Sequence, residues 1–204
     1  MSASILYIHG FNSSPDSAKA RQLGAVMQAL GLADRYAVPA LDNHPRIALQ
    51  QLEAAWPRLG RPLLVGSSLG GYYATVLAER HGLSALLINP AVRPWQVLEP
   101  LLGEQRNHHH GATWQLTGEH LAALQAMQVP PPVDASRYQV WLQTGDETLD
   151  YRQAEAFYRH CPLRIEAGGD HGFRGFVRRL PALLGFAGLP PERWQGLDPS
   201  QFER

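Results

Sequence analysis

Ser68 stands at the centre of the strongest chemical signal in the sequence. The stretch Gly66–Gly71 contains the G-x-S-x-G pattern, follows the apolar run Leu63–Val65 and precedes a segment with helical patterning. A nucleophilic serine needs this context of strand, sharp turn and helix, because small flanking residues let strand and helix approach and hold the hydroxyl clear of the backbone. A glycine-rich helix start can also cradle a phosphate, but no lysine follows here in P-loop spacing. We therefore expect Ser68 to be a nucleophile in strained backbone geometry.

A serine hydroxyl needs a base to take its proton, and His171 suits that role. It lies on the glycine-rich loop Gly168–Gly172, just after the predicted strand Leu163–Ala167, so it can reach over the end of the sheet. Several other histidines lie in predicted helices or at their ends, where we expect solvated side chains: His44, His81, His120 and His160.

An acidic residue should orient the imidazole, and Asp146 is the best candidate. It follows the predicted strand Val140–Thr144 and so lies at a strand end. Glu147 and Asp150 are rivals, although Asp150 has the position of an N-cap for the next helix. Asp170 is next to the histidine, but adjacent loop residues seldom point at one another.

Two backbone N–H groups should stabilise the negative charge that develops during acyl transfer. One is expected from Leu69, directly after the serine. The other is expected from Phe11, on the loop that follows the predicted strand Ile5–Ile8. Gly10 would let this loop come close to the substrate, and His9 is expected to lock the loop rather than act as a second base.

The triplet His108–His110 could in principle ligate a metal. Three adjacent side chains cannot all face one ion, however, and no cysteine or acidic cluster lies nearby. We expect neither a metal nor a cofactor.

The elements that must position these residues form an alternating pattern. Six short runs of continuous apolarity indicate strands that are buried on both faces, as in parallel sheets. They are Ile5–Ile8, Tyr36–Val38, Leu63–Val65, Ala85–Ile88, Val140–Leu142 and Leu163–Ile165. Five segments with helical patterning lie between or after these runs. They are Asp16–Leu30, the segment from the N-cap candidate Asn43 to Trp56, Leu69–Arg80, Tyr151–Arg159 and Phe173–Leu184. This alternation predicts an α/β fold with helices on both faces of the sheet.

One long segment interrupts the pattern, because no strand signal appears between Asn89-Pro90 and Tyr138. It contains Trp95 and Trp114, and helical spacing is visible over His120–Met127. A structureless loop of this length is improbable in a compact domain. We interpret residues 92–136, here named the insertion, as a small helical lid within one domain that spans residues 1–204.

Composition narrows the class of protein. The 204 residues carry eighteen Lys+Arg and eighteen Asp+Glu, so no positive surplus favours nucleic acid as a partner. The single cysteine, Cys161, cannot form an internal disulfide, and no apolar stretch is long enough to span a membrane. The first residues do not resemble a signal peptide. We therefore expect a cytoplasmic protein.

Four blocks of sequence together resemble the α/β-hydrolase superfamily, and more narrowly the small bacterial esterases of the YqiA/YcfP type. They are His9–Ser14, Gly66–Gly71, Gly145–Glu147 and Gly168–Phe173. The resemblance runs from residue 4 to about residue 187, and the block from Gln143 to Ala154 is more specific than the serine motif. It implies a minimal α/β-hydrolase of about six mostly parallel strands, without the first strands of the larger members.

The resemblance also implies a function. It places Ser68, Asp146 and His171 on the family's triad positions, in the chain order typical of this fold. The expected protein is a cytoplasmic serine carboxylesterase that hydrolyses small acyl esters through an acyl-enzyme on Ser68. Two alternatives remain open. One is an acyl-CoA thioesterase, for which Arg93 and Arg106 would be the phosphate ligands. The other is a non-catalytic binding protein of the same fold, whose mark would be a missing triad member.

Overall fold

Six strands form one parallel sheet in the computed structural model, which describes residues 3–107, 109 and 111–203. Their spatial order is β2-β1-β3-β4-β7-β8, and each neighbouring pair is parallel. The strands are β1 (Ile5–Ile8), β2 (Tyr36–Ala37), β3 (Leu63–Ser67), β4 (Ala85–Ile88), β7 (Tyr138–Gln143) and β8 (Leu163–Glu166). The six predicted strands and the α/β fold class are thereby confirmed.

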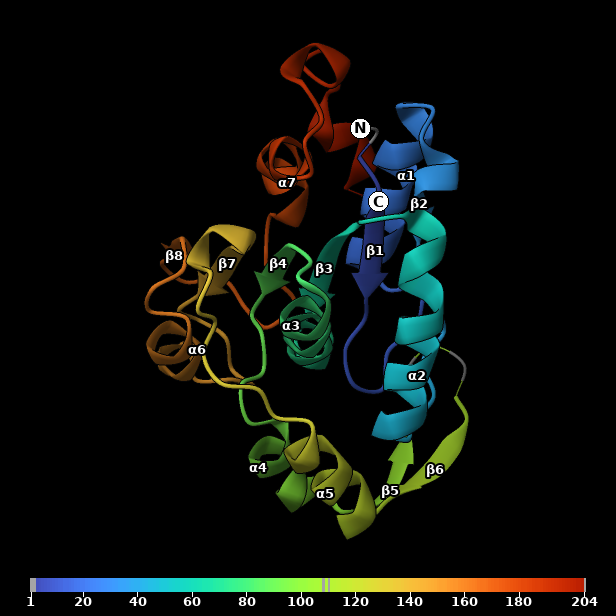
Figure 1. Ribbon diagram of the computed structural model, residues 1–204, viewed down its shortest axis with the longest axis vertical. Helices are drawn as coiled ribbons and strands as arrows, with labels where there is room; N and C mark the ends of the chain where they lie inside the picture. Colours follow the sequence, from blue (N-terminus) through green and yellow to red (C-terminus); the bar gives the residue numbers. More distant parts are fainter. Residues whose placement is uncertain (1–2, 108, 110, 204) are drawn as a thin grey trace.

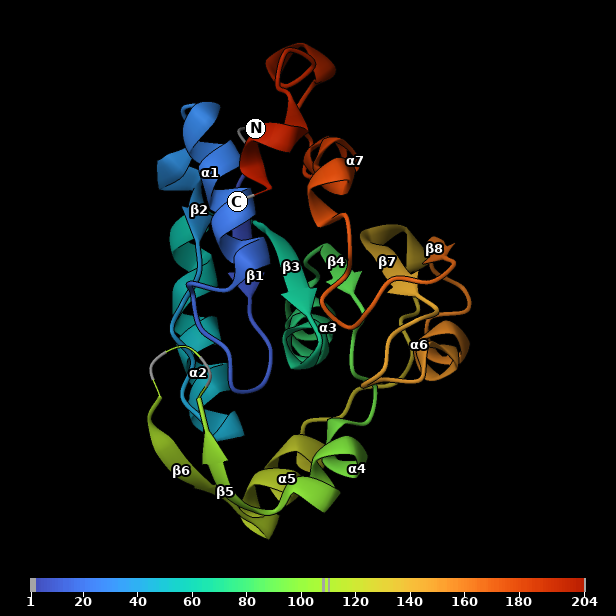
Figure 2. The same ribbon diagram turned by 180° about the vertical axis from the view of Figure 1, so that it is seen from behind.

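Helices cover both faces of this sheet, as Figures 1 and 2 show from opposite sides. One face packs against α2 (Pro45–Ala55), α3 (Leu69–His81) and α6 (Tyr151–Phe157). The other face packs against α1 (Ala18–Ala29) and α7 (Leu180–Phe186). Every residue of the central strands β1, β3 and β4 is buried, which explains why their sequences are continuously apolar rather than alternating.

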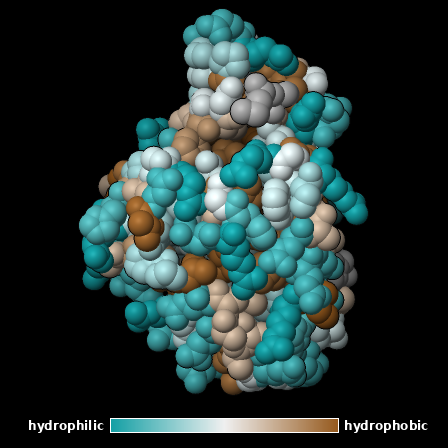
Figure 3. Space-filling model, viewed as in Figure 1, coloured by the Kyte–Doolittle hydropathy of each residue, from teal (hydrophilic) through white to brown (hydrophobic). Residues whose placement is uncertain are grey.

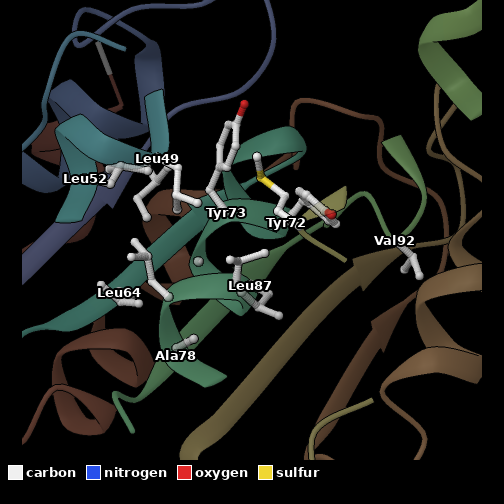
Figure 4. Close-up of a cluster of buried hydrophobic side chains, with 14 of the residues drawn as sticks. Leu49, Leu52, Leu64, Tyr72, Tyr73, Ala78, Leu87 and Val92 are labelled. Carbon is white, nitrogen blue, oxygen red and sulfur yellow. The ribbon is translucent and has the colours of Figure 1, made fainter. Parts of the chain in front are cut away.

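The core beneath α2 and α3 fixes the helix that begins beside Ser68. Leu49 and Leu52 of α2, Leu64 of β3, Ala78 of α3 and Leu87 of β4 belong to one cluster of buried side chains (Figure 4). Full burial of a leucine stabilises a fold by roughly 1.5–3 kcal/mol. These contacts hold α3 firmly against the strand from which it leaves.

Two helix boundaries differ from the predictions. The N-cap of α2 is His44 and not Asn43, because Pro45 occupies the first helical position and sets the start of the helix. The predicted helix over Phe173–Leu184 is wrong in its first part: a 3₁₀ turn covers Phe176–Arg179 and α7 starts only afterwards. The reason is that Phe173 and Gly175 have φ values of 63° and 75°, which no right-handed helix accepts.

The insertion folds outside the central sheet. It contains α4 (Pro94–Leu98), an antiparallel hairpin of β5 (Gly103–Arg106) and β6 (Thr113–Leu116), and α5 (Gly118–Ala126). Figure 1 shows these elements below the end of the sheet to which the strand arrows point. The hairpin contradicts the expectation that no strand lies in this segment. β5 is polar, and β6 alternates between exposed residues and the inward Trp114 and Leu116, so neither strand has the continuous apolar run that marks a strand buried on both faces.

The face seen in Figure 3 is mostly hydrophilic, with apolar residues scattered over it. Among the described residues, no helix is both long and apolar enough to cross a bilayer.

Candidate active site

Ser68 occupies the turn between β3 and α3 in a strained backbone conformation. Its φ and ψ are 57° and −123°, in a region that residues with a side chain rarely adopt. The glycines of the motif make the turn possible: a Cβ on Gly66 would overlap the carbonyl of Gly70, and one on Gly70 would overlap the carbonyl of Ile8. The strand and the helix therefore meet at backbone contact, with Ser68 at the apex.

The structure brings Ser68, His171 and Asp146 into one hydrogen-bonded chain. Nε2 of His171 lies 3.0 Å from the Ser68 Oγ, and Nδ1 lies 2.9 Å from both carboxylate oxygens of Asp146. The Asp146 side chain is 1% exposed and that of His171 is 24% exposed. When Nδ1 donates its proton to the carboxylate, Nε2 is left as an acceptor for the serine hydroxyl.

The rival acidic residues have other partners. Asp150 caps α6 by accepting the backbone N–H of Arg152 at 3.1 Å. The carboxylate of Asp170 lies 3.3 Å from the guanidinium of Arg174. The Asp146 carboxylate is fixed from its other side, because Oδ1 also accepts the N–H groups of residues 148 and 149, at 2.9 and 2.8 Å.

Glu147 has a role in this arrangement that the sequence did not reveal. Its Oε2 accepts the backbone N–H of His171 at 3.0 Å. Hydrogen bonds from the backbone N–H groups of Glu147 itself and of His171 lower the pKa of this carboxyl. Glu147 therefore stays ionised and holds the main chain of the histidine.

Two amide side chains at strand ends anchor the same loop, and sequence reasoning missed both. Asn89, just after β4, has a φ of 40°, and its Nδ2 donates to the carbonyl of Asp170 at 3.0 Å. Oε1 of Gln143, at the end of β7, accepts the backbone N–H groups of Asp170 and Arg174, at 3.1 and 2.8 Å. Their position in the sequence could have revealed them, because polar residues directly at the carboxyl ends of parallel strands face the site.

The loop after β1 lies against Ser68. A Cβ on Gly10 would lie 3.2 Å from the Cβ of Ser68, so this position admits little more than glycine. Phe11 and Leu69, the two expected N–H donors, line one small hollow beside this loop. His9 is buried, its Nε2 accepts the N–H of Leu41 at 3.3 Å, and burial lowers its pKa. The neutral ring of His9 thus ties the loop after β1 to Leu41, which lies between β2 and α2.

The hairpin of the insertion is bound to this loop. Nε1 of Trp114 donates to the Oδ1 of Asn12 at 2.8 Å, and the Nδ2 of Asn12 donates to Gln105 at 3.2 Å. Nδ2 of Asn107 donates to the carbonyl of Ser13 at 3.1 Å. The insertion therefore contacts the residues beside Ser68 directly.

A pocket of about 240 Å³ opens at Ser68 and His171, and Lys19 is part of its wall. The Nζ of Lys19 donates to the carbonyl of Gly172 at 2.8 Å. Burial lowers the pKa of this amine to about 8, although the charges of Asp170 and Asp146 oppose that shift. Lys19 is a further residue of the site that the sequence analysis did not single out.

No metal site is visible in the part of the chain that the structure describes, where no group of at least three His, Cys, Asp or Glu side chains could hold an ion. His108 and His110 of the histidine triplet lie outside the described residues.

Solved structures with this fold include several α/β-hydrolases. A crystal structure from Agrobacterium vitis S4, provisionally assigned as a hydrolase, has a TM-score of 0.72 at 19% identity and covers 90% of this chain and 87% of that chain. Alpha/beta hydrolase domain-containing protein 10 from mouse has a TM-score of 0.68 at 14% identity, with 91% and 92% covered. Est1E from Butyrivibrio proteoclasticus, with ferulic acid bound, has a TM-score of 0.66 at 14% identity, with 94% and 89% covered.

Sequence relatives point to one family. The UPF0227 protein YcfP from Salmonella arizonae is 25% identical over 194 residues, which cover 91% of this chain and 99% of the relative. A family model described as "Uncharacterised protein family (UPF0227)" matches residues 4–188. The chain therefore belongs to the UPF0227 family and has the α/β-hydrolase fold.

Proposed function

We propose that this protein is a serine hydrolase that cleaves carboxylic esters through an acyl-enzyme on Ser68. The observation that carries the proposal is the continuous hydrogen-bonded chain from the Ser68 hydroxyl through His171 to the buried carboxylate of Asp146. This order of nucleophile, base and orienting acid is the arrangement that activates a serine for acyl transfer. The fold shared with Est1E and other esterases supports the same class of reaction.

Each side chain has a definite part in the proposed reaction. His171 takes the proton of Ser68 as the Oγ attacks the ester carbonyl, and then gives the proton to the departing alcohol. Asp146 holds the imidazole in the correct tautomer and stabilises its cation. Water then attacks the acyl-enzyme, with His171 again as the base. The N–H groups of Phe11 and Leu69 are proposed to stabilise the oxyanion in both steps.

The insertion is proposed to act as a lid that selects the acyl group. Its hairpin is bonded to Asn12, next to the proposed oxyanion donor Phe11, and the Trp114 and Phe11 rings meet edge to face at 5.7 Å. Loops at the carboxyl ends of parallel strands lie where ligands bind in open α/β sheets. The insertion has the position and the aromatic side chains that such a role needs.

The geometry supports an enzyme over a binding protein of the same fold. A binding protein has no need of a serine in a strained turn whose hydroxyl meets an oriented histidine. A thioester would react at the same Ser68 by the same steps. A comparison of the rates for matched ester and thioester substrates therefore decides which leaving group the enzyme prefers. The expectation that the enzyme acts in the cytoplasm stays a prediction.

Labelling with a fluorophosphonate probe tests the proposal. The wild-type protein should be labelled on Ser68, and Ser68→Ala should abolish both labelling and ester hydrolysis, with a loss on the order of 10⁶ in kcat. Ser67→Ala is the matched control, because it removes the adjacent serine and should leave Ser68 open to the probe. Ester hydrolysis by Ser68→Ala within tenfold of wild type would contradict the proposal.

A further inference from the structure

Lys19 is the single lysine of the chain, and the other seventeen basic residues are all arginines. It is the second residue of α1, and the first turn of that helix contains no acidic residue. A cation at the N-terminus of a helix opposes the helix dipole. The stability of α1 therefore does not explain why a lysine stands at this position.

The surroundings of Lys19 leave its charge without a compensating partner. Its side chain is half-buried, and within the described chain it forms no ion pair. The two carboxylates whose charges act on Lys19, Asp170 and Asp146, are engaged by Arg174 and His171. The lowered pKa of the amine reflects the same imbalance, since burial outweighs the attraction of these two acids. An anion beside Lys19 would relieve this cost.

The pocket that Lys19 shares with Ser68 is suited to such an anion. Its lining residues include Tyr7, Ser17 and Ser67, whose side chains carry hydroxyl groups, as well as His171, and none of its lining residues is acidic. An ammonium group has three donors, of which Lys19 uses one on the carbonyl of Gly172. The two remaining donors are available to a ligand in the pocket.

We propose that the ester cleaved by Ser68 carries an anionic group, a carboxylate or a phosphate, and that Lys19 binds this group and sets the specificity. The inference rests on the proposed function, since it names the substrate class of the same site. A compact ammonium suits this small pocket better than the planar fork of a guanidinium. This difference between an ammonium and a guanidinium explains why a lysine stands at position 19, whereas every other basic residue of the chain is an arginine.

Pairs of esters that differ in one charge test the proposal. The p-nitrophenyl monoester of glutaric acid is compared with p-nitrophenyl hexanoate, and acetoxyethyl phosphate is compared with acetoxyethanol. The ratio of kcat/KM for the anionic over the neutral ester should exceed one in the wild type and fall about 10- to 100-fold in Lys19→Met, as expected for a lost charge-assisted hydrogen bond. Lys19→Arg should restore part of the ratio, and the responding pair identifies carboxylate or phosphate.

The ratio separates recognition from a structural role. If Lys19 acted only through Gly172 on the His171 loop, its loss would slow both esters equally, and an unchanged ratio in Lys19→Met would overturn the proposal. The proposed function fails independently of this result if Ser68→Ala hydrolyses the esters as the wild type does.

A second measurement uses unmutated protein and does not depend on the folding of a variant. Reductive methylation of Lys19, followed by peptide mass spectrometry, should be slowed by glutarate or by inorganic phosphate and not by the neutral amide hexanamide at equal ionic strength. Equal methylation rates in all three solutions would also overturn the proposal.

Discussion

The carboxylate of Glu147 accepts the backbone N–H of His171, while the carboxylate of its neighbour Asp146 holds the ring of the same histidine. Two consecutive acidic residues after β7 thus fix both the main chain and the imidazole of one residue on a distant loop. A rotation of the imidazole is opposed by Asp146, and a shift of the loop is opposed by Glu147. The precision of the site depends on this pair acting together.

Glu147→Gln should reduce stability in a way that depends on pH. The pKa of Glu147 is lowered from its ordinary value of 4.5, so the unfolded chain takes up this proton before the folded one does. The carboxylate therefore stabilises the fold above pH 4.5, and this contribution is lost as the pH falls below that value. Urea unfolding from pH 3 to pH 7 is expected to show wild type and variant converging at the acidic end.

Two comparisons complete this test. Glu192→Gln removes an equal charge at an exposed position and controls for net charge. A gap between wild type and Glu147→Gln that widens towards acidic pH would refute the assignment. The kcat of Glu147→Gln should fall by no more than about 10-fold, because other anchors still hold the loop and a full 1 Å misplacement costs on the order of 10²-fold.

Asp146→Asn should lower kcat by about 10³–10⁴-fold and leave the fold intact. The amide can still accept the N–H groups of residues 148 and 149, but its NH₂ group favours the wrong tautomer of His171. Steady-state hydrolysis and circular dichroism check the two parts of the prediction. Asp150→Asn is the control, since asparagine caps a helix about as well as aspartate. The choice of acid is wrong if Asp150→Asn proves the more damaging change.

Gly70→Ala should destabilise the protein by at least about 1–3 kcal/mol, because its methyl group would enter the backbone of β1 where no side chain can move aside. Gly118→Ala is the matched control at the start of α5, where a Cβ meets no atom within 4 Å. That change should be neutral or stabilise the fold by about 0.4–1 kcal/mol. Thermal unfolding of both variants decides the matter, and equal melting temperatures would show that the turn is looser than described.

Trp114→Ala should change the acyl-length preference by 10- to 200-fold at most, the range that one methylene-sized change in a pocket produces. The expectation follows from the contacts of Trp114 with Asn12 and Phe11 beside the site. Trp95→Ala should act in the same direction through its contact with Tyr72. A series of p-nitrophenyl esters measures the preference.

Trp194→Ala provides the control for the lid prediction, because this tryptophan packs on the other face of the sheet, near α7. It should lower the melting temperature without altering the preference. If Trp114→Ala leaves the acyl-length preference unchanged and greatly lowers stability, the insertion packs on the core and does not select the acyl group.

Buried strands and the serine turn were predictable because their signals are local. The apolar runs mark strands covered on both faces, and Gly66 is dictated by its backbone contact with Gly70 in the same turn. Gly70 belongs to the same local motif, although the backbone that it approaches is that of Ile8 in β1. The hairpin over β5 and β6 was not predictable in this way. Its stabilising contacts are with distant parts of the chain: it is bonded to the loop after β1, and Trp114 and Leu116 of β6 pack on the core.

The supporting residues of the site were less visible for a related reason. Asn89, Gln143 and Glu147 act on the loop around His171, and each bond joins parts of the chain that only the sheet brings together. Lys19 reaches the site from a helix whose first turn gives no hint of the loop at Gly172. No fixed spacing in the sequence identifies residues that meet only through the tertiary fold, whereas a strand, a turn and a helix each have a recognisable local pattern.

The bonds between the loop after β1 and the hairpin have a consequence for the order of events in refolding. Asn12 and Ser13 are joined to partners 93, 94 and 102 residues further along the chain, and Ser68 meets a histidine 103 residues away. Contacts between such distant residues form late, after local helices and turns. During renaturation, far-ultraviolet circular dichroism should therefore recover first, and ester hydrolysis should return only when the hairpin docks on the loop.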